Sequence, residues 1–117
     1  IGNRVRKAVT IANNASLSDA VDVRGFRPVA VITPSGWDAA AITFQASADD
    51  ITYNNVYGAT GVEVSITSLT GAGYRGFLSE QQLALLGAQY LKVRSGTAGS
   101  PVNQSGAVEI ILMLEKL

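Results

Sequence analysis

Two residue types are missing from this sequence: its 117 residues include no cysteine and no histidine. Histidine is the usual general base near neutral pH, and thiolates and imidazoles are the usual ligands of zinc. The chain therefore has no Ser-His-Asp triad, no Cys-His pair and no zinc site built from Cys and His. We expect a protein that acts by binding or assembly, without catalytic residues and without a cofactor.

Excess charge and long apolar runs are absent as well. Nine basic residues balance nine acidic ones, whereas a nucleic-acid-binding domain usually carries a basic excess. The longest uninterrupted apolar run, residues 110–114, is far shorter than the ~20 residues of a membrane-spanning helix. We expect neither a nucleic-acid nor a membrane partner. With 47% hydrophobic and only 15% charged residues, the chain should fold around a real core.

Short segments of alternating apolar and polar residues recur between clusters of Gly, Asn, Ser and Pro. A period of two is typical of strands with one buried face. In the clearest case, Val108, Ile110, Leu112 and Leu114 would share one face. About eight such strands predict an all-β fold, an antiparallel β-sandwich or jelly roll. The predicted strands are residues 5–12, 17–23, 29–32, 42–47, 51–53, 62–67, 90–94 and 107–115.

The remaining segments predict one short helix and two loops. Residues 79–86 favour the helix, with Ser79 as its cap and Gly87 at its end. The Gly-rich residues 68–76 and the polar residues 95–106 are predicted to be loops that are mobile in the free protein and become ordered on docking.

Basic residues are concentrated at the start of the chain, where Arg4, Arg6 and Lys7 supply three of the nine. A charged terminus of this kind is often only solvated. The alternative is an extended arm that contacts an acidic partner surface, because period-two spacing puts Arg4 and Arg6 on one side. We therefore divide the chain into a basic arm at residues 1–8 and a single β-sandwich domain at residues 9–117.

Acidic residues give two candidate sites. Asp49 and Asp50 are adjacent, so in an extended chain they point to opposite sides, and Asp is favoured in turns. Calcium needs six to eight oxygen ligands, and the spaced acidic loop that would supply them is missing. We predict a turn, with a weak calcium site as the alternative. Asp19, on an otherwise apolar face, is interpreted as an edge charge that discourages strand addition.

The single tryptophan, Trp37, lies in a predicted loop. Sandwiches often bury such a residue, and core packing is the first interpretation. The alternative is an exposed aromatic side chain for a sugar ring or a protein partner. Tyr53, Tyr57 and Tyr74 would widen such a patch.

Several stretches of the chain also form a recognisable set. They are residues 16–20 (SLSDA), 23–25 (VRG), 34–37 (PSGW), 42–57 (ITFQASADDITYNNVY), 90–97 (YLKVRSGT) and 107–114 (AVEIILML). Together they resemble small virion proteins of tailed bacteriophages over about residues 9–114. The resemblance implies a capsid decoration or cement protein on the capsid surface. Its partners would be the major capsid protein or other virion subunits, and it would form a homo-oligomer, with a trimer favoured.

Three functions stay open from the sequence. The first is capsid decoration, and the second is another virion component such as a head-tail connector, tail or spike-base protein. The third is a glycan-binding β-sandwich module, because residues 42–57 are also similar to discoidin-type jelly rolls, although this chain has Asp50-Ile51 where those have Asp-Gly. The candidate partner contacts are Arg4, Arg6, Lys7, Trp37, Tyr74 and Arg75.

Overall fold

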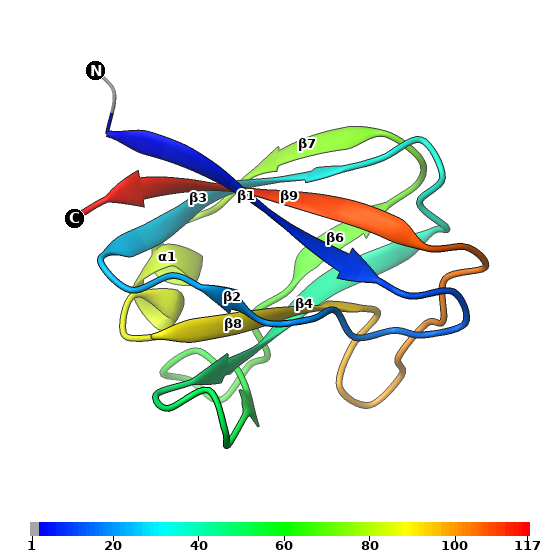
Figure 1. Ribbon diagram of the computed structural model, residues 1–117. Helices are drawn as coiled ribbons and strands as arrows, with labels where there is room; N and C mark the ends of the chain where they lie inside the picture. The colour runs from blue at the N-terminus through cyan, green and yellow to red at the C-terminus, as the bar shows by residue number, and fades with distance from the viewer. Residues whose placement is uncertain (1–2) are drawn as a thin grey trace.

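Two antiparallel sheets pack face to face in the computed structural model, which describes residues 3–117 (Figure 1). The described chain forms nine strands and one helix. These are β1 (Arg4–Ile11), β2 (Val21–Asp22), β3 (Phe26–Thr33), β4 (Ala40–Ser47), β5 (Asn54–Asn55), β6 (Ile66–Leu69), β7 (Gly73–Gly76), α1 (Ser79–Leu85), β8 (Tyr90–Ser95) and β9 (Val108–Lys116).

The strand order identifies the sandwich as a jelly roll. Sheet A has the order β1-β9-β3-β7, and sheet B has the order β2-β8-β4-β5, with β6 also paired to β4. The chain crosses between the sheets after most strands, as in a jelly roll. The exceptions are the connections from β4 to β5 and from β5 to β6, which stay in sheet B because both β5 and β6 pair with β4. The predicted all-β antiparallel sandwich is therefore confirmed.

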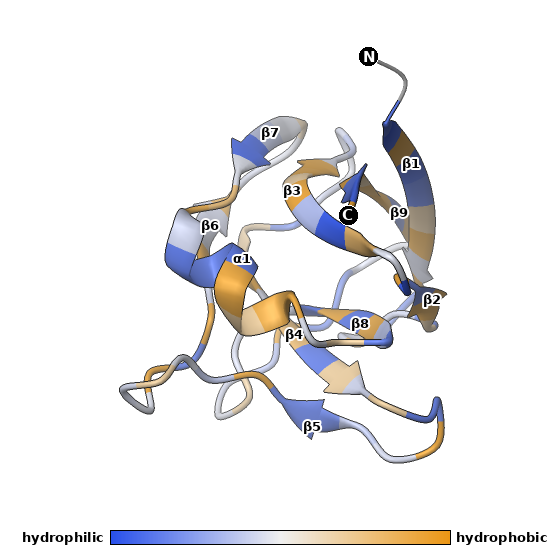
Figure 2. Cartoon of the chain, turned by 90° about the vertical axis from the view of Figure 1, so that its left-hand side faces the viewer, coloured by the Kyte–Doolittle hydropathy of each residue, from blue (hydrophilic) through white to orange (hydrophobic). Residues whose placement is uncertain are grey.

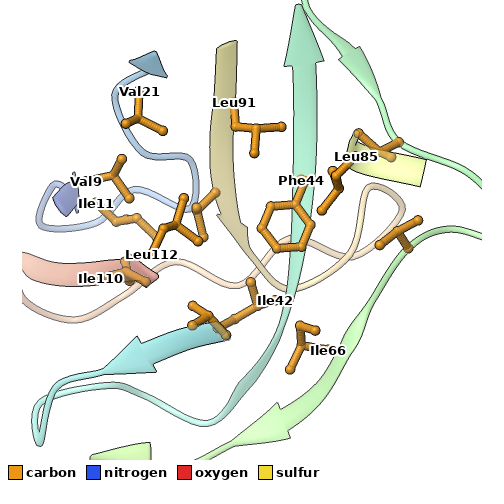
Figure 3. Close-up of a cluster of buried hydrophobic side chains, with 14 of the residues drawn as sticks. Val9, Ile11, Val21, Ile42, Phe44, Ile66, Leu85, Leu91, Ile110 and Leu112 are labelled. Carbon is orange, nitrogen blue, oxygen red and sulfur yellow. The ribbon is translucent and has the colours of Figure 1, made fainter. Parts of the chain in front are cut away.

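Alternating side chains from both sheets fill the interior. In β9, the residues predicted to share a face, from Val108 to Leu114, are all buried. In β4 and β8, the inward positions Ile42, Phe44 and Leu91 are fully buried opposite them. Each such side chain contributes about 1.5–3 kcal/mol by leaving water. Figure 3 shows this cluster, in which Val9, Ile11, Ile42, Phe44, Leu91, Ile110 and Leu112 are labelled.

The helix α1 connects sheet A to sheet B and lies against β3 (Figure 2). It buries Leu85 in the core. The predicted helix is confirmed, but Ser79 does not cap it: the main-chain N–H of Leu78 donates to Gln81 Oε1 at 2.8 Å, one residue earlier. No helix within residues 3–117 is long and apolar enough to cross a bilayer.

The predicted basic arm is part of the sandwich from Arg4 onward, so the division at residue 8 is wrong there. Residues 4–8 pair with β9 in the same uninterrupted ladder as the rest of β1. The physical reason is that Val5 continues the inward phase of Val9 and packs against the core, while Arg4 and Arg6 occupy outward positions. Lys7 also has the inward phase, and its ammonium reaches the main-chain oxygen of Asp22. Residues 1 and 2 of the predicted arm lie outside the described residues.

The two predicted loops are also more firmly held than expected. Residues 73–76 form β7, which pairs with β3. Residues 95–106 are anchored by the buried side chain of Gln104. Its Oε1 accepts the main-chain N–H of Asp38 at 2.7 Å, and its Nε2 donates to Ser95 Oγ at 2.8 Å. These contacts hold both segments in place, whereas the sequence predicted loops that are mobile in the free protein.

Candidate interaction surface

Six of the nine basic residues lie together at one end of sheet A. The strand register brings them there, because Arg4 of β1 and Arg27 of β3 both stand opposite Glu115 of β9. Asp22 and Glu115 are the acidic residues bonded within the group, so six positive and two negative charges leave a local charge of +4 in a neutral chain. We call this group the basic cluster: Arg4, Arg6, Lys7, Arg24, Arg27 and Lys116.

Glu115 joins two arginines of the basic cluster. Its Oε1 accepts Arg27 Nε at 2.9 Å and Arg27 Nη2 at 2.5 Å, and its Oε2 accepts Arg4 Nη2 at 3.1 Å. The guanidinium of Arg27, followed by that of Arg4, holds the pKa of the Glu115 carboxyl below its usual value. The single negative charge of Glu115 therefore balances only one of the two positive charges carried by Arg4 and Arg27. Among the described residues, Arg6 has no carboxylate within 4.0 Å.

The turn after β2 contacts the other side of the basic cluster through Asp22 and Arg24. Hydrogen bonds from the Arg24 side chain and main chain lower the pKa of Asp22 to about 2, with Arg24 Nη2 lying 2.6 Å from Asp22 Oδ2. Lys7 Nζ donates to the main-chain oxygen of Asp22 at 2.7 Å and lies 5.3 Å from the ring centroid of Phe26. Lys7 therefore ties β1 to this turn, whereas Arg4 and Arg6 stay outward and exposed.

An apolar groove of about 470 Å³ runs between α1 and residues 57–65. Several of its lining side chains are large, apolar and exposed, and Leu83 is 70% exposed. Contiguous exposed apolar surface of this kind marks interaction sites. The charged side chains at its lining, Glu63 and Glu80, are both acidic. The exposed apolar residues that define the apolar groove are Tyr57, Val62, Leu78 and Leu83.

A smaller hollow of about 200 Å³ links the apolar groove to the basic cluster. Arg27, a member of the cluster, lines this hollow together with Leu83 and Leu86 of the α1 region. Leu83 also lines the apolar groove. The two features therefore meet on one continuous surface, which is basic at one end and apolar with acidic residues at the other.

A buried ion pair fixes the wall of the groove. Arg94 Nη1 lies 3.2 Å from Glu63 Oε2, and the two side chains are only 7% and 17% exposed. Arg94 also donates to Asn55 Oδ1, and Glu63 accepts the main-chain N–H of Ala98 at 3.1 Å. The sequence does not reveal this pair, because alternation places Arg94 on the polar face of a strand. Nothing in the pattern indicates that residues 55–63 fold back over that face.

The six predicted partner contacts lie in three places, the basic cluster, the core and strand β7. Arg4, Arg6 and Lys7 belong to the basic cluster. Trp37 does not contribute to any surface: it is 2% exposed, and its Nε1 donates to the main-chain oxygen of Ala40 at 3.4 Å. Its assignment as a partner contact is wrong, and the core interpretation is confirmed. A sugar-binding platform that includes Trp37 is excluded for the same reason.

Tyr74 and Arg75 are both in β7, at the edge of sheet A away from the basic cluster. Tyr74 is 66% exposed opposite Ile32. The guanidinium of Arg75 is held by Thr67 Oγ1 and by the main-chain oxygen of Ser68. Because Trp37 is buried, the aromatic patch that Tyr53, Tyr57 and Tyr74 would have widened does not form around it.

The adjacent acidic residues form a turn, as predicted. Asp49 Oδ1 accepts the main-chain N–H groups of Thr52 and Ile51, each at 2.9 Å, and these bonds lower the pKa of Asp49. Asp50 has a φ of 62°, the left-handed conformation that Asp tolerates in turns. Within residues 3–117, no group of three or more acidic side chains is placed to hold a metal ion.

Comparison with known proteins supports the fold assignment. No protein-family model matches the chain, and no curated protein matches it by sequence. The SPBc2 prophage-derived protein YomS is similar in structure, with a TM-score of 0.53 and 17% identity over 97% of this chain and 96% of YomS. At that identity the likeness shows the fold alone. The coat protein dimer of Tobacco streak virus matches at a TM-score of 0.37 and 12% identity, over 99% of this chain and 88% of that one, too weakly to carry an argument.

Proposed function

We propose that this chain is a structural protein of a bacteriophage virion, which decorates the capsid and stabilises it by binding across capsid subunits. The observation that carries the proposal is the continuous surface on which the basic cluster and the apolar groove meet. The sequence resemblance to small phage virion proteins and the jelly-roll fold, similar to that of a prophage-derived protein, support it. In this proposal the chain acts by contact alone, without catalysis or a cofactor.

The two parts of the surface would have different tasks. Docking of the apolar groove removes its side chains from water, which stabilises the complex by about 25 cal/mol per Å² of apolar area. The basic cluster favours a partner that presents acidic groups. A protein that binds only the assembled shell stabilises that shell by about 2.7 kcal/mol per site when its free concentration is 100 times Kd.

The proposal includes a homo-oligomer, with a trimer favoured by the resemblance. A chain with no net charge has little self-repulsion to oppose such an assembly. Native mass spectrometry of the purified protein tests this part. A monomer at micromolar concentration would remove the trimer from the proposal and would leave capsid decoration to be judged on particles.

Copy number separates decoration from the other virion roles. Quantitative mass spectrometry of purified particles should find hundreds of copies of a decorating protein at the capsid surface. A dozen or fewer would assign the chain to a head-tail connector, tail or spike base and would overturn decoration.

A matched pair of variants tests the apolar groove itself. Leu83→Ser removes an exposed apolar side chain from the groove, and we expect at least about tenfold weaker retention on washed capsids. Ile51→Ser makes the same kind of change at an exposed residue that does not line the groove, and retention should be unchanged. Equal retention of both variants would exclude the groove as the docking site.

A further inference from the structure

The outer edge of β1 has backbone groups without partners. β1 is the first strand of sheet A, with β9 on one side only. Thr10 shows which residues face the free edge, because its N–H donates to Asp19 Oδ1 at 2.8 Å and its C=O accepts the N–H of Asp19 at 3.2 Å. Backbone groups alternate sides along an antiparallel strand, so those of Arg4, Arg6 and Ala8 face the same edge. Within residues 3–117 no backbone group bonds to them.

Asp19 limits how far this edge is open. It occupies both backbone groups of Thr10 and places a carboxylate there, which blocks strand addition at that end. The edge-charge interpretation of Asp19 agrees with this geometry. The open edge therefore comprises residues 4–8 and offers three N–H donors and three C=O acceptors, enough for a short strand.

The charge beside the open edge selects what can bind there. Arg4 and Arg6 are exposed on the outer face of sheet A, within a cluster whose local charge is +4. In an added strand, the residues opposite these arginines would point to the same face and be spaced two apart. Carboxylates at alternate positions would therefore meet both guanidiniums. Arg6 offers the stronger attraction, since among the described residues it has no carboxylate partner.

A second copy of β1 does not fit this edge. The antiparallel two-fold register that uses all three open residues places Arg6 opposite Arg6 of the other copy. A shift in one direction places Arg4 opposite Arg6, and like charges directly opposite each other are destabilising. A shift in the other direction places Arg4 opposite Thr10 of the other copy. The backbone groups of Thr10 are already bonded to Asp19, so they cannot pair with a second strand.

We propose that residues 4–8 of β1 bind, by strand addition, an extended segment of a partner protein in which acidic residues occupy alternate positions. This deepens the proposed function, on which it rests for the origin of the partner, by stating the chemistry of the partner segment. The backbone groups supply the affinity that does not depend on sequence, and Arg4 and Arg6 supply the selection for acidic side chains.

Peptide binding to the purified full chain tests the proposal. The probe is an eight-residue capped peptide with glutamate at every second position and threonine between, measured by calorimetry at low salt. We expect binding, protection of the Arg6 and Ala8 amides from hydrogen exchange, and no binding of the peptide with lysine in place of glutamate. N-methylation of alternate peptide nitrogens should abolish binding. Failure of the acidic peptide to bind, or binding that survives N-methylation in both registers, would overturn strand addition.

Variants locate the binding to the edge. Arg6→Glu should lower the affinity for the acidic peptide at least about tenfold. Lys92→Glu makes the same charge change on sheet B and should leave that affinity unchanged. Ala8→Pro removes one edge donor while leaving the β9 ladder intact, and should weaken binding as well. If Ala8→Pro does not fold, the affinity of Arg6→Glu for the peptide and the protection of the Arg6 and Ala8 amides test the site instead.

Equal loss of peptide affinity in Arg6→Glu and Lys92→Glu would refute the site. Copy number on virions is measured independently, so failure of the capsid role and failure of strand addition are distinguishable.

Discussion

Arg94 and Glu63 form an ion pair that closes residues 57–65 onto sheet B, with 3.2 Å between Arg94 Nη1 and Glu63 Oε2. Both side chains are largely withdrawn from water, where an isolated charge is costly. The pair compensates that cost only while both partners are present. Its position at the wall of the apolar groove makes the shape of the groove depend on it.

Loss of the Glu63 carboxylate should therefore destabilise the fold. Glu63→Ala leaves the guanidinium of Arg94 buried without an anion, and we expect the free energy of unfolding to fall by about 3 kcal/mol. Urea unfolding monitored by circular dichroism measures the change. The matched control is Glu109→Ala, an exposed glutamate outside any described ion pair, which should change stability little. Equal unfolding midpoints for the two variants would contradict a structural role for the pair.

Two valines close together in sequence should respond in opposite ways to a charge. Val64 is 6% exposed in the core, and Val64→Asp places an unpaired carboxylate there, at a cost of several kcal/mol. Val62 is 69% exposed, so Val62→Asp should leave the protein folded. Thermal unfolding compares the two variants. A cooperative transition near that of the parent chain for Val64→Asp would show that Val64 is not a core residue.

Gly96 is the glycine whose replacement should be most costly. Its φ is +89°, and an added Cβ would lie 2.6 Å from the main-chain oxygen of Ser100 and 2.7 Å from the main-chain nitrogen of Val102. Gly96→Ala should lower the free energy of unfolding by more than about 1 kcal/mol. Gly99→Ala, in the same loop with open space around the glycine, is the control and should be nearly neutral. Urea midpoints that do not separate these variants would refute the close approach at Gly96.

Stability should fall in acid through the carboxylates of the basic cluster. The pKa values of Asp22 and Glu115 are lowered in the folded state, to about 2 for Asp22, against an ordinary value of 3.8. Above about pH 5.5 both groups are ionised whether or not the chain is folded, because the ordinary pKa values are 3.8 for Asp22 and 4.5 for Glu115, so their ion pairs contribute fully. As the pH falls from about 5.5 to 2, the carboxyls of the unfolded chain take up protons first, and this contribution is lost.

Urea midpoints between pH 6 and pH 2 measure this acid loss. Asp22→Asn removes the carboxylate that pairs with Arg24, so its midpoint should decline less steeply over the same interval. Parallel pH profiles for the parent chain and the variant would contradict a contribution from Asp22.

The fold was predictable from sequence wherever one face of a strand is wholly apolar. Val108 to Leu114 and Ile42 to Phe44 show this pattern, because each alternate residue enters the core. Gly73–Gly76 was not predictable as a strand, since its glycines carry no side-chain signal and its position depends on backbone pairing with β3. The boundary proposed at residue 8 failed because charge on an outward face is compatible with a strand.

The candidate surface was only partly predictable for a different reason. Arg4, Arg6 and Lys7 are neighbours in sequence, so their concentration is visible at once. Arg27 and Lys116 join them only through strand pairing with β9 and β3, respectively. The apolar groove was missed because Leu83 occupies a helical position where sequence favours burial, and its exposure is decided by tertiary structure.

The place of β9 in sheet A has a consequence for how this protein is made. Strand β9 lies between β1 and β3, so β1 has no partner in its sheet until β9 has been synthesised. Folding that waits for such distant segments is slow, typically milliseconds to seconds. We expect sheet A to form only after synthesis of β9, in one cooperative step. Chains truncated before β9 should therefore expose β1 and β3 to proteolysis and aggregation.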